Sequence, residues 1–239
     1  MDASKLISFG YYHDGVWDYV KQKKDPTGLQ HLPIVLIPTY PSSGSEYASG
    51  AVSIDSRTKD FGVALGITAN YGILVPKYTV TLNPELTAYS CFVTFVQLST
   101  TVLGDNNPIS YDEGISVIKN VLKAAEKLKD NPADLNARGV ILYAASISVA
   151  DRIGLGKTDH YSFDLYQIEY VPEVLFGSSY RKGLTTLFPR FLKTVSKKHE
   201  DDVRLYFKNV FNFSGTIDES INKLIQIFVD YGIDMYFQG

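Results

Sequence analysis

Apolar residues follow two different spacings along the 239 residues of the chain. As far as residue 82 they come in short runs separated by polar or glycine-containing turns, which is typical of β-strands. The polar segment 56–60 lies between two such runs and predicts a β-hairpin. The run at 34–37 is apolar at all four positions, so we expect that strand to be buried on both faces. The expected strands are 34–37, 51–55, 61–65, 73–75 and 78–82.

From residue 84 onward the apolar positions recur every three or four residues, which is the spacing of an amphipathic helix. Asn83 suits the N-cap and Pro84 the first turn, so a helix is predicted to begin there. Two segments, 110–113 and 216–219, have the Ser/Thr-x-x-Glu pattern of a capping box. Further helices are predicted over 131–153, 162–176 and 182–198. One apolar helix face is formed by Ile115, Ile118, Val121, Leu122, Ala125 and Leu128.

These two patterns predict an α/β part followed by an all-α part. We place the domain boundary where the spacing changes, with domains at residues 1–83 and 84–239. A short helix is expected at the start of the first domain, over residues 1–9. In the second domain we expect Arg138, on the helix predicted over 131–153, to be a structural position that forms a salt bridge.

The composition excludes several classes of protein. A net charge of −3 provides no general basic surface for nucleic acid. The single cysteine, Cys91, excludes an internal disulfide framework and a cysteine-based zinc cluster, and it favours a reducing compartment. No apolar run approaches the roughly 20 residues that a membrane helix needs, and no signal-peptide core is visible. We therefore expect a cytoplasmic protein that binds neither nucleic acid nor membrane.

Candidate chemistry is concentrated directly after the first expected strand, in Pro38-Thr39-Tyr40-Pro41-Ser42-Ser43-Gly44-Ser45-Glu46. Backbone N–H groups at a strand-to-helix junction suit an anion. We expect Ser43 or Ser45 to cap a helix that runs toward Ala51.

This segment resembles the signature loop of iron-containing alcohol dehydrogenases, whose usual form is Pro-Thr-Thr-Ala-Gly-Thr-Gly-Ser-Glu. Thr39, Gly44, Ser45 and Glu46 match it, whereas Tyr40 replaces the second Thr and Ser42 the first Gly. The resemblance implies a remnant of a cofactor-binding loop, formed by Thr39, Ser43, Gly44 and Ser45.

Other segments extend the resemblance over most of the chain. Asp2, Ala3 and Lys5 match a helix of the form Ile-Asp-x-x-Lys, and residues 11–20 resemble the Asp-x-Trp-Asp segment of the butanol dehydrogenase branch. Residues 83–87 resemble Asp-Pro-Glu-Leu-Thr, which opens the family's helical domain. The implied fold is dehydroquinate synthase-like: a truncated remnant of a dinucleotide-binding α/β domain, followed by a helical domain.

The resemblance also implies that the chain is truncated at both ends. The family's glycine turn for the dinucleotide pyrophosphate would lie before Met1, and its helical domain normally continues past Ile233. The closing residues 236–239 also resemble part of an engineered protease site.

In this family one divalent metal lies between the domains, on an Asp, a His four residues later and two further His. The resemblance places these positions on Thr101, Asp105, Tyr166 and Tyr180. The assignments of Tyr166 and Tyr180 rest on matches in the residues that flank them. Those of Thr101 and Asp105 rest on an ungapped count from Asn83. All four ligands are therefore replaced and no metal is expected. Arg181, beside the last of them, is expected to repel a dication. The alternative is a metal held by Asp105 together with Tyr166 and Tyr180, the two tyrosines binding as tyrosinates.

We therefore expect a degenerate family member without metal-dependent dehydrogenase activity, acting as a binding or subunit protein. No cofactor is expected, although NAD(P) and iron or zinc are those of the family. The alternative is an NAD(P)-dependent alcohol or aldehyde oxidoreductase whose nucleotide-binding half or metal is supplied by another chain. Because the family's first strands are missing, we expect the α/β part to pair with a second copy or a partner chain.

Overall fold

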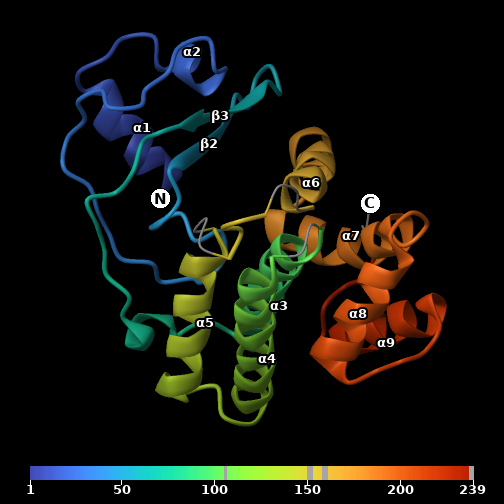
Figure 1. Ribbon diagram of the computed structural model, residues 1–239. Coiled ribbons are helices and arrows are strands. Elements are labelled where there is room, and N and C mark those ends of the chain that lie inside the picture. The colour runs from blue at the N-terminus through green and yellow to red at the C-terminus, as the bar shows by residue number, and fades with distance from the viewer. Residues whose placement is uncertain (105–106, 150–152, 158–160, 237–239) are drawn as a thin grey trace.

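A computed structural model describes residues 1–104, 107–149, 153–157 and 161–236 of the chain. The N-terminal third forms a small α/β part, and the remainder forms a larger helical part (Figure 1). A helix is predicted at the start of the chain, and one is observed there.

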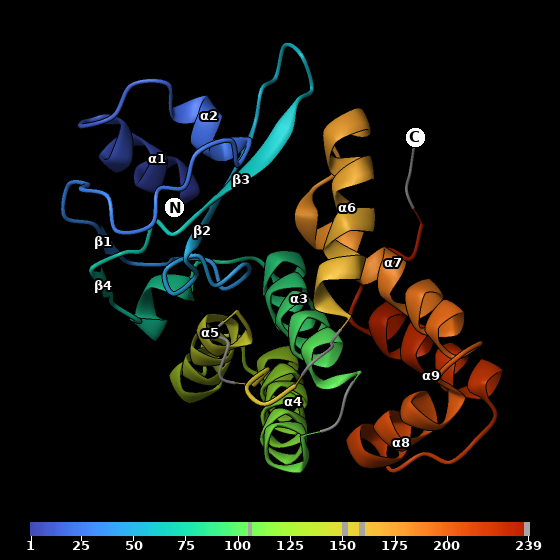
Figure 2. The same ribbon diagram turned by 45° about the horizontal axis from the view of Figure 1, so that its top comes forward.

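The α/β part contains two small sheets covered by short helices. β2 and β3 pair as an antiparallel hairpin with Gly50 opposite Leu65, which confirms the predicted hairpin, and β1 pairs in parallel with β4. α1 packs on β2 and α2 on β3 (Figure 2). The elements are α1 (Asp2–Gly10), α2 (Val16–Val20), β1 (Val35–Leu36), β2 (Gly50–Ile54), β3 (Phe61–Leu65), β4 (Tyr71–Gly72) and the 3₁₀-helix η1 (Pro76–Thr79).

Three of the expected strands need correction. The strand expected over 34–37 has only two residues, and it is not buried on both faces, because Val35 is 53% and Ile37 45% exposed. The strands expected over 73–75 and 78–82 do not form. Pro76 instead opens η1, since its ring suits the first turn of a helix. The hydroxyl of Thr79 donates to the Pro76 carbonyl oxygen at 2.8 Å and closes that turn.

The helical part is built around α3 (Pro84–Val102), in which every side chain from Thr87 to Val102 is buried. A helix buried on all sides lies in the interior of its domain. α3 is surrounded by α4, α5, α6 and α7 (Figure 1). The remaining helices are α4 (Pro108–Asp130), α5 (Leu135–Ser148), α6 (Ser162–Phe176), α7 (Tyr180–Val195), α8 (Glu200–Phe211) and α9 (Ile217–Asp230).

Two of the predicted helix starts are confirmed. Asn83 caps α3 by accepting a hydrogen bond from the Leu86 backbone N–H at 2.7 Å. Thr216 and Glu219 form the predicted capping box at α9.

Two other predicted helix starts are wrong. α4 begins at Pro108 with Asn107 as its cap, and the Ser110 hydroxyl donates to the Leu155 carbonyl oxygen instead of capping. α5 begins at Leu135 with Asp134 as its cap, so Ile153 lies beyond that helix.

Arg138 is structural, as expected, but it forms no salt bridge among the contacts of the described residues. Its buried guanidinium donates to the carbonyl oxygens of Pro132, at 2.6 Å, and Thr79, at 2.5 Å. These bonds join α5 to η1 and so attach the helical part to the α/β part.

The fold is therefore an α/β part followed by a helical part, as the sequence predicts. Buried apolar side chains form one cluster before residue 83 and a larger one after it, although the division into domains at 83 and 84 stays our interpretation. None of the helices in the described ranges is long and apolar enough to span a membrane. Residues 237–239, part of the suspected engineered site, lie outside those ranges.

Candidate functional site

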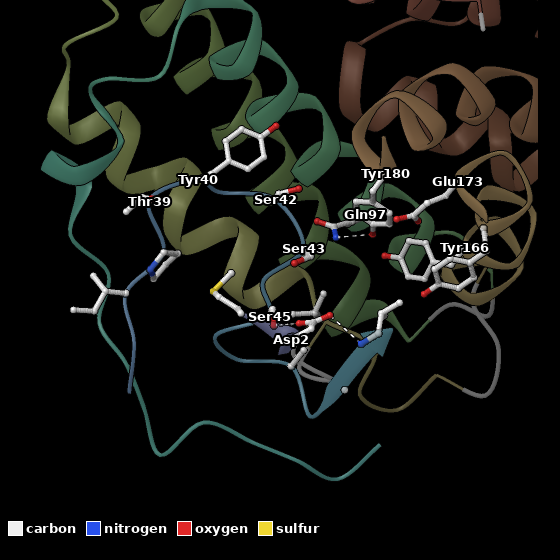
Figure 3. A pocket seen from close by; sticks show the side chains of 18 residues that line it. Asp2, Thr39, Tyr40, Ser42, Ser43, Ser45, Gln97, Tyr166, Glu173 and Tyr180 are labelled. Atoms are coloured by element: carbon white, nitrogen blue, oxygen red, sulfur yellow. Dashed lines mark hydrogen bonds between the residues drawn. The ribbon is translucent and has the colours of Figure 1, made fainter. Parts of the chain in front are cut away.

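A cavity of about 580 Å³ lies between the two parts of the molecule (Figure 3). One wall is the loop after β1, which contributes Thr39, Ser42 and Ser43. The opposite wall comes from α3, α6 and α7, and it presents Gln97, Tyr166, Tyr170, Glu173 and Tyr180. The fold therefore brings the candidate loop and two of the expected metal positions to one cavity.

The residues of the loop that match the family motif fix its position. Gly44 has a left-handed φ of 62°, and a Cβ at this position would lie 2.3 Å from the Ala145 carbonyl oxygen of α5. The Ser45 hydroxyl donates to the Asp2 carboxylate of α1. The buried Glu46 carboxylate accepts from the Ser146 hydroxyl at 2.5 Å. The loop is held to α1 and α5 by these contacts, and the helix expected to run toward Ala51 does not form.

Of the four residues expected to bind a cofactor, Thr39, Ser43 and Ser45 line the cavity. Gly44 packs against α5 instead. Tyr40 and Ser42, two of the departures from the family motif, also line the cavity. The residues that differ from the motif therefore face the site as directly as those that match it.

Of the four expected metal positions, Tyr166 and Tyr180 line the cavity, with their ring centroids 6.4 Å apart. Thr101 does not line the cavity; its hydroxyl donates to the Gln97 carbonyl oxygen inside α3 at 3.0 Å. Asp105 lies outside the described residues.

The α3 residue at the cavity is Gln97, one helical turn before Thr101 (Figure 3). Its amide N–H donates to the Tyr180 hydroxyl at 3.1 Å, and its amide oxygen accepts from the Ser148 hydroxyl at 3.1 Å. The assignment of the first two metal positions to Thr101 and Asp105 stays a prediction.

The tyrosines at the cavity are neutral phenols. Burial raises the pKa of Tyr166 and Tyr180 far above the ordinary value, and it raises that of Tyr170 to about 12. A phenol must lose its proton to be a strong metal ligand. Among the described residues no group of three or more His, Cys, Asp or Glu side chains is placed to hold a metal. The hydroxyl and amide groups that line this end of the cavity therefore do not fit the family's divalent metal.

Arg181 does not contribute to this argument as expected. Its guanidinium lies over the ring of Tyr89, 5.6 Å from the centroid, and it is not part of the cavity wall. Repulsion of a dication by Arg181 is therefore not needed to explain the misfit.

A pair of carboxyls lies behind the tyrosines on α6. Glu169 is fully buried, and neither of its oxygens has a hydrogen-bond donor among the described residues. Burial, followed by the charge of Glu173, raises the pKa of Glu169 to about 8. Two such carboxyls share a hydrogen bond only when one of them is protonated. With a pKa of about 8, Glu169 holds its proton at neutral pH. Burial also raises the pKa of Glu173, whose carboxyl group lines the cavity.

The chemistry of the wall is also unsuited to a phosphate group. Among the described residues no Lys, Arg or His side chain lines the cavity, whereas Asp2 and Glu173 both do. The other described side chains of the wall are phenols, aliphatic hydroxyls, one amide and apolar groups. These side chains offer no positive charge to a dinucleotide.

The sequence model of the iron-containing alcohol dehydrogenase family matches residues 1–76. Similarity to butanol dehydrogenases of this family extends over nearly all of the chain.

Among curated relatives, the probable NADH-dependent butanol dehydrogenase 1 of Bacillus subtilis is 24% identical over 92% of this chain and 58% of its own length. The NADH-dependent butanol dehydrogenase A of Clostridium acetobutylicum is 24% identical over 99% of this chain and 55% of its own length. The chain therefore spans a little over half the length of these relatives.

The solved structures show the same fold. That of NADH-dependent butanol dehydrogenase A from Thermotoga maritima has a TM-score of 0.84 and 24% identity, over 96% of this chain and 58% of that one. The aldehyde reductase YqhD from E. coli has a TM-score of 0.81 and 19% identity, over 99% of this chain and 63% of that one.

Proposed function

We propose that this chain is a ligand-binding member of the iron-containing alcohol dehydrogenase family without metal-dependent dehydrogenase activity. The observation that carries the proposal is the hydrogen-bonded set Gln97, Tyr166 and Tyr180 at the cavity, two of which occupy positions where the resemblance expects metal ligands. Metal-dependent hydride transfer needs a Lewis acid on the alcohol oxygen and a dinucleotide beside it. Neutral phenols and an amide supply neither a strong ligand set nor a positive charge. What the cavity retains is volume and hydrogen-bonding capacity, which suit a small molecule.

Metal content is the direct test. We expect protein expressed in medium rich in iron and zinc to carry much less than one metal ion per chain by mass spectrometry. About one iron or zinc per chain, lost in the variants Tyr166→Phe and Tyr180→Phe, would contradict the proposal. That result would instead support a tyrosinate metal site that includes Asp105.

Cofactor binding and turnover provide a second test. Calorimetry is expected to show no NADH or NADPH binding in the micromolar range, because no basic side chain among the described residues lines the cavity. No butanol or butanal turnover should follow the protein through purification. Turnover that appears when a second, nucleotide-binding chain is added would establish the alternative, an oxidoreductase completed by another chain. A cytoplasmic location is part of the proposal, since the lone Cys91 is a buried free thiol.

A further inference from the structure

The charged side chains that line the cavity are acidic. Among the described residues these are Asp2 and Glu173. Asp2 is engaged by the Ser45 hydroxyl and by the backbone N–H of Val52 at 3.0 Å, so its charge is already partly compensated. Glu173 has Glu169 as its carboxyl partner and projects from α6 at the cavity wall (Figure 3). A ligand that brings a positive charge to Glu173 would compensate the negative charge that remains.

Aromatic rings surround the same carboxylate. Tyr166 and Tyr170 precede Glu173 on α6, and Tyr180 faces them from the first turn of α7. Tyr170 is supported from the hairpin by Phe61, whose ring centroid lies 4.3 Å from its own. The π-face of a tyrosine attracts an organic cation, and the attraction is stronger when water is excluded. Several tyrosines beside one carboxylate form a recognised arrangement for binding ammonium groups.

We propose that the cavity binds a small organic ammonium ion, with the charged nitrogen between Glu173 and the tyrosines of α6 and α7. This proposal rests on the proposed function, because it places the ligand where the family holds its metal. The apolar side chains of Ile37, Pro38 and Val149 line another part of the wall and are suited to the alkyl portion of the ligand. The volume of about 580 Å³ is in the range of small-molecule sites.

The same features disfavour the ligands that the family resemblance suggests. An anion near Glu173 would meet a like charge in a partly desolvated wall, where electrostatic interactions are stronger than in water. A neutral alcohol would gain hydrogen bonds from the hydroxyls but no charge compensation. The charge pattern therefore predicts that an ammonium ion binds most tightly, a neutral alcohol less tightly and an anion most weakly.

Three probes of equal length test this order: hexylamine, hexan-1-ol and hexanoate. At neutral pH they present a cation, a neutral hydroxyl and an anion on the same alkyl chain. Their dissociation constants are measured by calorimetry and by NMR titration with the full chain. We expect hexylamine to bind at least tenfold more tightly than hexan-1-ol, and hexanoate to bind most weakly.

Variants of Glu173 and Tyr166 separate charge from packing. Glu173→Gln removes the charge and keeps nearly the same side-chain shape, and thermal unfolding checks that folding is preserved. Hexylamine affinity should fall at least fivefold while hexan-1-ol affinity changes less than twofold. Glu126→Gln, an exposed carboxylate on α4, is the control for net charge and should change neither. Tyr166→Leu should lower the affinity for hexylamine more than Tyr166→Phe does, because Phe keeps the aromatic ring.

Each other result would overturn the ammonium site. Tighter binding of hexanoate or inorganic phosphate would show an anion site at the loop, and equal binding of all three probes would show a non-selective apolar cavity. An amine preference that Glu173→Gln leaves intact would place the cation elsewhere. None of these results requires bound metal or turnover, so failure of the ammonium site is distinguishable from failure of the proposed function.

Discussion

Glu169 is held in its neutral form by the close approach of α6 and α7. A Cβ at Gly183 of α7 would lie only 2.3 Å from the Glu169 carboxyl oxygen, so the two helices meet through a glycine. The carboxyl is thereby shielded from water, and the charge of Glu173 adds to the rise of its pKa. The close packing of the helices thus accounts for both the retained proton and the negative charge presented to the cavity.

This environment predicts a pH-dependent stability. The pKa of Glu169 is raised from an ordinary value of 4.5 to about 8 in the folded chain, so folding favours the protonated form. The stability that protonated Glu169 contributes to the folded chain is fully present below pH 4.5 and is lost as the pH rises through 8. Glu169→Gln removes the ionisation and keeps a donor for Glu173. The variant should be more stable than the parent by on the order of 1–3 kcal/mol at pH 9, as measured by urea unfolding.

Glu126→Gln serves as the control for this experiment, because that side chain is exposed on α4. Its stability should run parallel to that of the parent from pH 5 to pH 9. Parallel curves for Glu169→Gln as well would mean that Glu169 does not hold a proton in the folded chain.

At the scale of elements, the loop 38–46 connects the two parts of the molecule. It is attached to α1 through Ser45 and to α5 through Gly44 and Glu46. The part of the loop between these contacts and β1 is left to line the cavity with Thr39, Ser42 and Ser43. The residues that match the family motif therefore have a structural role in this loop: they hold it against α1 and α5.

The joint can be tested with two glycines of similar backbone conformation. Gly44 and Gly28 have φ values of 62° and 75°, but a Cβ at Gly28 would meet nothing within 4 Å. Gly28→Ala should cost about 1 kcal/mol for the left-handed backbone alone. Gly44→Ala should cost roughly 2–4 kcal/mol, because the new methyl group also collides with α5. Equal losses of unfolding free energy in the two variants would show that the loop is not pinned as described.

Sequence reasoning predicted the helix starts that depend on local contacts alone. Asn83 and the Thr216–Glu219 box bond only to their own first turns, and both were correctly predicted. The capping role of Ser110 was wrong because its hydroxyl bonds to a residue distant in sequence, Leu155. Asn131 was chosen where Asp134, three residues later, caps the helix. A capping pattern thus predicts a helix start only when tertiary contacts do not compete for the side chain.

The cavity residue on α3 could not be predicted in the same way. Because that helix is buried on every side, its sequence has no polar stripe to show which residues face the cavity. Flanking residues that resemble the family pointed to Tyr166 and Tyr180, which line the cavity, whereas no such residues pointed to Gln97. The available signal was that Gln97 lies on the same helix face as Thr101, four residues away.

At the scale of the whole molecule, the edge of the α/β part is open. β1 and β4 form a sheet of only two strands among the described residues. Tyr71 is 68% and Ile73 44% exposed, beside the exposed Val35 and Ile37. We call these four residues the β1–β4 edge surface. Unpaired strand edges with exposed apolar side chains favour association with another chain.

We propose that a second copy of the chain covers the β1–β4 edge surface, because two identical open edges can pair about a twofold axis. Light scattering at tens of micromolar should give the mass of a dimer. Replacing Val35 and Tyr71, which are opposite each other in the sheet, with Lys should shift the protein to a monomer. Phe176→Ser is the control, since Phe176 is 81% exposed but lies at the end of α6; it should leave the mass unchanged. A parent that stays monomeric at high micromolar concentration, or cross-links confined to residues 110–232, would rule out pairing through this edge.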